Sequence, residues 1–348
     1  MELGLDAVLL LVSFVVILAG AELFTNAIEW FGRKLGLGEG MVGSVLAAVG
    51  TALPETMIPI IAILFVRTPE SEAVGIGAIL GAPFMLSTAA MFVTGIAVLA
   101  YARSGRRTTT LRVNQRILGR DLRTFLGMYV FAVAMGLPFF DKPLWLRVLA
   151  GVALVLAYVF YVRQTARDPK DNSDASHEEL NPLRLQPNIE TPNMSVVVLQ
   201  LVVSLAAIVG GAHLFVREIS VFSAAFGLSP LILSLIIAPL ATELPEKFNS
   251  VLWIRRRKDT LALGNISGAM VFQSCIPVAV GLWFTPWILN TAAIASAVVA
   301  IGAGLLLQVF LRTGNSLSGR ELTSLGIFYV AFIVYVVGFY QGPVPAPH

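Results

Sequence analysis

The chain has 348 residues, of which 57% are hydrophobic and only 13% are charged, with a mean hydropathy of +0.81. These values are typical of a polytopic membrane protein and exclude an ordinary soluble domain. The pI near 9.1 does not indicate a nucleic-acid partner, because the basic residues fall in short loops between apolar spans. The single cysteine, Cys275, excludes an intrachain disulfide and a cysteine metal cluster.

Apolar spans follow one another along the chain, each long enough to cross a bilayer, which takes about 20 residues. Ten can be drawn, at 5–30, 39–65, 73–99, 124–140, 144–162, 195–216, 229–254, 260–284, 289–311 and 322–340. Residues 1–163 then hold five spans and residues 194–348 another five. The polar stretch 164–193 joins them, and its Asp, Glu, Asn and Pro content predicts a mobile linker.

The basic residues predict the orientation. Of the 24 lysines and arginines, 19 fall in the loops after the first, third, fifth, seventh and ninth spans. Positive charge marks the cytoplasmic side, so we expect a multi-pass protein of the cell membrane with both termini outside the cytoplasm. Five spans per half then make the second half enter the membrane from the opposite side. The predicted fold class is an all-α polytopic membrane protein with ten transmembrane helices in two inverted-topology five-helix repeats.

A six-residue motif supports the duplication. It reads Gly-Thr-Ala-Leu-Pro-Glu at 50–55 and Ala-Thr-Glu-Leu-Pro-Glu at 241–246. Residues 21–55 align without a gap on 212–246, and 77–82 align on 264–269. A charged residue inside a membrane costs about 2.5–3.5 kcal/mol on insertion scales. Two carboxylates at matched positions therefore indicate a functional site.

The prolines of the motif explain how it would bind a cation. Pro54 and Pro245 have no N–H, so the carbonyls four residues earlier lose their helical donors and a break is expected. A dehydrated cation replaces the donors, and Ca²⁺ takes about 6–8 oxygen ligands. The candidate metal ligands are two carbonyls, two hydroxyls and two carboxylates: Gly50, Ala241, Thr51, Thr242, Glu55 and Glu246.

The second motif carries one more acid. Glu243 lies three residues before Glu246 and shares its helix face. With Glu55 these form a predicted cluster of three carboxylates, which cannot all ionise without a counter-cation. A proton held there suits proton coupling, whereas Lys247 is either an internal counter-ion or points away from the site. Glu22, aligned with His213, either lines an ion path or makes a structural hydrogen bond.

These motifs resemble the calcium/cation antiporter superfamily, in particular its prokaryotic sodium/calcium exchanger-like branch. The hallmark there is Gly-Thr-Ser-Leu-Pro-Glu in the second and seventh helices, followed by Gly-Asn-x-x-Gly-Ser-Asn-type third and eighth helices. The resemblance covers essentially the whole chain. It implies an ion site built by the second, third, seventh and eighth helices, with the first and sixth moving across it.

The resemblance transfers some ligands and not others. It assigns Thr51, Thr242, Glu55 and Glu246 as ligands, and it adds Gln273 at an amide position of the eighth helix. Other family oxygens are replaced here by Ala52, Glu243, Ala82, Leu86 and Ala269. The family's several-sodium stoichiometry is therefore not implied.

The expected function is secondary active antiport of a divalent cation, Ca²⁺ in the first instance, against Na⁺ or H⁺. No cofactor is expected beyond these transiently bound ions, and the partners are inorganic cations and lipid, with a monomer as the plausible state. The alternatives are a carrier of Mg²⁺ or Mn²⁺, and a scaffold that kept the fold without transport. An enzyme is not expected, because His213 is the one histidine within a span. Paired glycines, Gly77 with Gly81 and Gly264 with Gly268, predict close helix packing.

Overall fold

The structure is a computed structural model that describes residues 2–35, 55–139, 142–166, 180–313 and 316–339. At positions 2, 3, 166, 241, 244–249 and 339 it describes the backbone alone. The described chain is mainly helical, with irregular connections and one short antiparallel strand pair, in which Thr110 lies opposite Ser318. This confirms the mainly helical class that the composition predicted.

The helices follow the order of the predicted spans. In the first half they are α1 (Glu2–Lys34), a helical segment from Glu55 that continues as the π-helix η2 (Ile61–Val66), α4 (Pro69–Met85), the π-helix η3 (Leu86–Ala90), α5 (Met91–Arg103), α6 (Gln115–Gly136) and α7 (Leu144–Ala166). In the second half they are α8 (Met194–Phe226), α9 (Pro230–Arg255), α10 (Asp259–Phe284), α11 (Thr291–Thr313), α12 (Gly319–Ser324) and α13 (Gly326–Phe339). The strands are β1 (Thr110–Leu111) and β2 (Leu317–Ser318).

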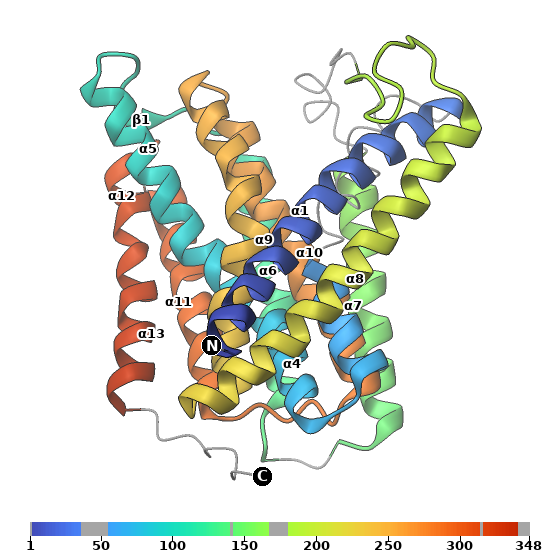
Figure 1. Ribbon diagram of the computed structural model, residues 1–348. Coiled ribbons are helices and arrows are strands. Elements are labelled where there is room, and N and C mark those ends of the chain that lie inside the picture. Colours follow the sequence, from blue (N-terminus) through green and yellow to red (C-terminus); the bar gives the residue numbers. More distant parts are fainter. Residues whose placement is uncertain (1, 36–54, 140–141, 167–179, 314–315, 340–348) are drawn as a thin grey trace.

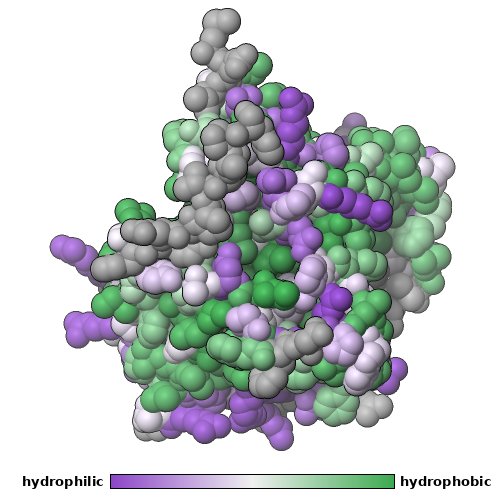
Figure 2. Space-filling view, turned by 90° about the horizontal axis from the view of Figure 1, so that it is seen from below, coloured by the Kyte–Doolittle hydropathy of each residue, from purple (hydrophilic) through white to green (hydrophobic). Residues whose placement is uncertain are grey.

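Most of these helices suit a membrane. Among the described residues, 7 helical stretches are long and apolar enough to cross one, and Glu55–Val66 and Pro230–Leu240 are shorter apolar helices. Large apolar side chains on the outer faces of α1, α7 and α13 are exposed, as lipid contact requires. On the face of the molecule seen from below, hydrophobic residues extend to the rim, and hydrophilic residues are dispersed among them (Figure 2).

Two predicted helix bounds and one predicted break were wrong. The sixth span, expected at 195–216, is α8, which continues ten residues further, to Phe226. The fourth span, expected at 124–140, is α6, which begins nine residues earlier at Gln115. The reason is the side chain of Asn114, which accepts hydrogen bonds from the N–H groups of Arg116 and Ile117 and so caps the helix. The expected break at Pro245 is also not seen, because α9 continues from Pro230 to Arg255. The matching Pro54 lies outside the described residues.

The linker also differs from the expectation of a mobile segment. Its described part, 180–193, packs on α1 and α8, and Leu183 within it is fully buried. In Figure 1 this part lies beside the upper ends of the two helices. We call this the linker end of the molecule.

Two helix pairs organise the interior. α1 and α8 run antiparallel and lie against each other along most of their length (Figure 1). α4 and α9 pack closely, because a Cβ atom at Gly77 or Gly81 would lie 2.3 Å from a backbone oxygen of Leu231 or Leu235. The equivalent prediction for Gly264 was wrong, since a Cβ there would meet nothing within 4 Å.

Candidate ion-binding site

Glu55 begins the helical segment that leads into η2, directly after the first motif. Its side chain points inward and is 8% exposed. Nε2 of Gln273, on α10, donates a hydrogen bond to Oε2 of Glu55 at 2.7 Å, and Gln273 is 1% exposed. The structure thus brings together two predicted ligands that lie in opposite halves of the chain.

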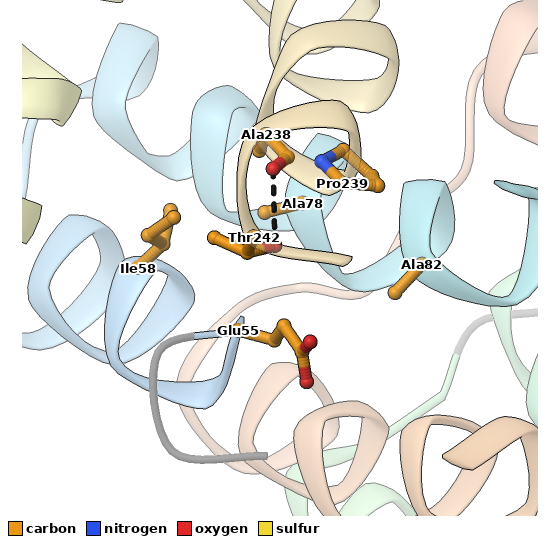
Figure 3. A pocket seen from close by; sticks show the side chains of 7 residues that line it. All are labelled: Glu55, Ile58, Ala78, Ala82, Ala238, Pro239 and Thr242. Carbon is orange, nitrogen blue, oxygen red and sulfur yellow. Dashed lines mark hydrogen bonds between the residues drawn. The ribbon is translucent and has the colours of Figure 1, made fainter. Parts of the chain in front are cut away.

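A small cavity opens beside this carboxylate. It is enclosed by three helical segments, and its lining residues are Glu55, Ile58, Ala78, Ala82, Ala238, Pro239 and Thr242. Figure 3 shows Glu55 on one side and the α9 residues Ala238 and Thr242 across from it. Its volume is about 10 Å³, which is roughly the space that one water molecule needs and far below that of pockets for organic ligands. The cavity therefore suits a single small ion or water molecule.

The lining provides oxygen ligands among methyl and methylene groups. Glu55 and Thr242 are the lining residues that carry side-chain oxygens. The hydroxyl of Thr242 donates to the carbonyl of Ala238 at 3.0 Å, which keeps its oxygen lone pairs available as ligands. Carboxylate, hydroxyl and amide oxygens are the donors that hard cations such as Ca²⁺ prefer.

Glu243 is the next residue of α9, and it is fully buried. A carboxylate at this depth in a low-dielectric interior is stable as an anion only where cations or hydrogen-bond donors compensate it. It therefore places a second buried carboxyl group directly after Thr242 of the cavity lining. The cluster expected from Glu55, Glu243 and Glu246 is not tested, because the side chain of Glu246 lies outside the described part.

The remaining predicted ligands divide by position. Gly50 and Thr51 fall in a segment that the structure does not describe. Ala241 lies on α9, where the backbone alone is described, and as in any helix Pro245 cannot donate to its carbonyl. The same limit applies to Lys247.

Sequence reasoning missed part of the cavity lining, and the structure decides the role of one acid that it left open. Pro239 and Ala238 were not predicted, although a second proline upstream of Pro245 in the same span was a usable signal. Glu22 does not line this cavity. Its Oε1 pairs with the guanidinium of Arg184, from the linker, at 2.5 Å.

Comparison with known proteins identifies the family. The family described as "Sodium/calcium exchanger protein" matches residues 5–164 and 196–341. The putative antiporter CaxA of Alkalimonas amylolytica is 26% identical over 310 residues, 88% of this chain and 90% of the relative. The sodium/calcium exchanger MaX1 of Methanosarcina acetivorans is 24% identical over 344 residues, 94% of this chain and 97% of the relative.

A solved structure has the same fold. The crystal structure of an H⁺/Ca²⁺ exchanger, CAX, superposes with a TM-score of 0.69 at 14% sequence identity, covering 97% of this chain and 82% of that one. The match to the family extends over both halves of the molecule and includes the helices that surround Glu55. The chain belongs to the sodium/calcium exchanger family of membrane cation antiporters.

Proposed function

We propose that the protein is a secondary active antiporter that moves a divalent cation, Ca²⁺ in the first instance, against Na⁺ or H⁺. The observation that carries this proposal is the buried contact between Glu55 and Gln273 at the edge of a cavity too small for an organic substrate. The names of the relatives are consistent with Ca²⁺. We place the protein in the cell membrane with both termini outside the cytoplasm, on the evidence of its basic loops.

The helix arrangement supports the proposal of alternating access. α1 and α8 contact the helices around the cavity mainly through apolar side chains, among them Ile17, Phe215 and Ile219 against Ile61 and Val74. An apolar interface has few directional bonds to break when one body shifts on the other. We propose that the α1–α8 pair shifts across the cavity-bearing helices, so that the site opens to one side of the membrane at a time.

The identity of the coupling ion depends on what neutralises the charge of the buried carboxylates when the divalent cation has left. A proton and a divalent cation both neutralise a buried carboxylate, so the two compete for Glu55. Ala82, 2% exposed, lines the cavity with a methyl group and supplies no oxygen. This favours exchange against H⁺, or against a mixture of H⁺ and Na⁺, over exchange against several Na⁺ ions, which would need more oxygen ligands.

Ion flux in proteoliposomes tests the proposal. Purified protein would be reconstituted and ⁴⁵Ca²⁺ uptake followed after imposing an outward Na⁺ gradient or a pH gradient. We expect uptake under at least one gradient and its loss in Glu55→Gln. The matched control is Glu70→Gln, the same substitution at an exposed position in the first turn of α4, which should retain flux.

The other outcomes are informative. Uptake of Mg²⁺ or Mn²⁺ in place of Ca²⁺ would assign a different cargo to the same site. No flux of any of these cations under either gradient would refute transport and leave a scaffold that kept the exchanger fold.

A further inference from the structure

The linker makes a specific set of contacts with α1 and α8 that the ion site does not explain. Residues 180–185 lie across the two helices at the linker end, upper right in Figure 1. Leu183 is fully buried there against Ala27 and Trp30 of α1 and Val197 of α8. We call residues 180–185 the clasp.

Asn26 of α1 is the first hub of the clasp, and it is 7% exposed. Its Nδ2 donates to the carbonyls of Asn181 and Pro182 at 3.2 and 3.3 Å. Its Oδ1 accepts from the backbone N–H of Arg184 and from Nε2 of Gln200, both at 3.0 Å. The amide therefore uses its full hydrogen-bonding capacity on the linker and on α8.

Gln200 of α8 is the second hub, and it is 1% exposed. Its Oε1 accepts from the backbone N–H of Leu185 at 3.0 Å. Its Nε2 donates to the carbonyl of Leu23 at 2.9 Å as well as to Asn26. One side chain thus bonds α8 to α1 and to the linker, and its geometry is satisfied only when all three are in register.

The helices beneath the clasp are also in close contact. A Cβ atom at Gly20 of α1 would lie 3.1 Å from the backbone oxygen of Ser204, and one at Gly211 of α8 would lie 3.2 Å from the backbone oxygen of Ser13. Such small-residue contacts hold two helices together by packing over a long stretch. The clasp adds directional bonds at one end of this interface.

A separate polar network ties the other helices together at the same end. The guanidinium of Arg107, in the loop after α5, bonds both carboxylate oxygens of Asp259 at the start of α10, at 2.8 and 2.9 Å. The same guanidinium donates to the carbonyl of Ile254 on α9 at 2.8 Å. One set of polar contacts thus lies within the group formed by α1, α8 and the clasp, and the other joins α9, α10 and the loop after α5. The surface between these two bodies is mainly apolar.

We infer that the clasp, through Asn26 and Gln200, makes α1 and α8 a single rigid body whose two helices keep their register while it moves. Asn26 and Gln200 are thus positioning residues for the transport cycle. This inference rests on the proposed function for its effect on flux, but the rigidity of the pair is measurable without transport.

Distances between spin labels test the rigidity. Labels would be attached through Lys34→Cys at the end of α1 and Ser195→Cys at the start of α8, both exposed, in a Cys275→Ser background. We expect one narrow distance distribution, unchanged by Ca²⁺, in the otherwise native protein. The double variant Asn26→Ala/Gln200→Ala should broaden it, and the turnover of flux should fall roughly 2- to 30-fold with the half-saturating Ca²⁺ concentration unchanged.

A matched pair at one position isolates a single bond. Arg184 is the second residue of a turn in which Gln186 N–H donates to the carbonyl of Leu183 at 2.9 Å, a place that proline accommodates. Arg184→Pro removes the N–H that bonds Asn26, whereas Arg184→Ala keeps it and loses the exposed pairing with Glu22. We expect broadening in the proline variant alone.

The same measurements overturn the inference. An unchanged distribution in the double variant would show that packing alone holds the pair. Equal broadening by Arg184→Pro and Arg184→Ala would assign the effect to the pairing with Glu22 and not to the bond with Asn26. A rise in the half-saturating Ca²⁺ concentration at unchanged turnover would place Asn26 and Gln200 in ion binding instead. If the native protein shows no flux, the proposed function fails, and the label distances still decide whether the clasp exists.

Discussion

Replacing Gln273 by glutamate tests whether Glu55 and Gln273 hold a cation between them. The two side chains are buried and joined by one hydrogen bond of 2.7 Å. Gln273→Glu keeps the size of the side chain and replaces the donor by a carboxylate oxygen. Two like charges about 4 Å apart repel by about 4 kcal/mol at an effective dielectric constant of about 20.

This repulsion acts in the cation-free state and is relieved either by a shared proton or by a divalent cation. In alkaline solution the variant should therefore bind Ca²⁺ more tightly than the native protein. Since 1.4 kcal/mol corresponds to about a tenfold change, the repulsion sets an upper limit of roughly a thousandfold, and we expect at least about tenfold. At acid pH the shared proton competes with the cation, so the difference in Ca²⁺ affinity between the variant and the native protein should become smaller.

Calorimetric titration with Ca²⁺ measures both effects. Repeating the titration in two buffers of different ionisation enthalpy gives the number of protons released per cation, which should rise toward one more in Gln273→Glu than in the native protein. Gln273→Met, similar in size and neutral, should release no additional proton. The reasoning is refuted if Gln273→Glu shows native affinity and native proton release across the pH range, because the two side chains then do not share a cation.

Three further substitutions test the packing and the polar networks. Gly77→Ala would place a methyl group 2.3 Å from a backbone oxygen of α9. Such overpacking should cost about 1–3 kcal/mol of stability and lower the Tm. The control is Gly264→Ala, which has nothing within 4 Å of the new methyl group and should leave the Tm unchanged. Asp121→Asn disturbs a buried carboxylate that accepts hydrogen bonds from Tyr161 and Ser267, so thermal denaturation should show a loss of about 1–3 kcal/mol. Arg107→Ala leaves its carboxylate partner on α10 buried and should cost about 3–5 kcal/mol, a loss absent from Arg106→Ala at the exposed neighbouring position.

The sequence predicted the helices wherever hydrophobic length decided the outcome. α7, α10 and α11 begin and end within a few residues of their predicted spans. The start of α6 depended on a local cap by Asn114, which lies outside any apolar window. The continuity of α9 shows why a proline predicts a break only weakly: proline removes one donor and strains one turn, while packing on both sides of α9 holds the helix together.

The candidate site was predictable in its chemistry and less so in its shape. Glu55 was identified because a carboxylate in an apolar span is costly and so marks a function, and Gln273 because the resemblance places a ligand amide at its position. Ala78, Ala82 and Ala238 shape the cavity by being small, and an alanine in an apolar span gives no such signal. The clasp was not predicted for a related reason, since Asn26 and Gln200 are satisfied by backbone groups of a polar linker whose composition indicates disorder.

The duplicated sequence does not give two equivalent half-sites. Gly77 and Gly264 align in the repeat, yet Gly77 lies against the backbone of α9 and Gly264 has open space around it. The position after the motif threonine is an alanine in the first half and the buried Glu243 in the second. Of the two aligned glycines, Gly77 makes the close helix contact, and the additional carboxylate lies on α9. The carboxylate at this position therefore has no counterpart in the first half, and the two halves contribute different residues to the region around the cavity.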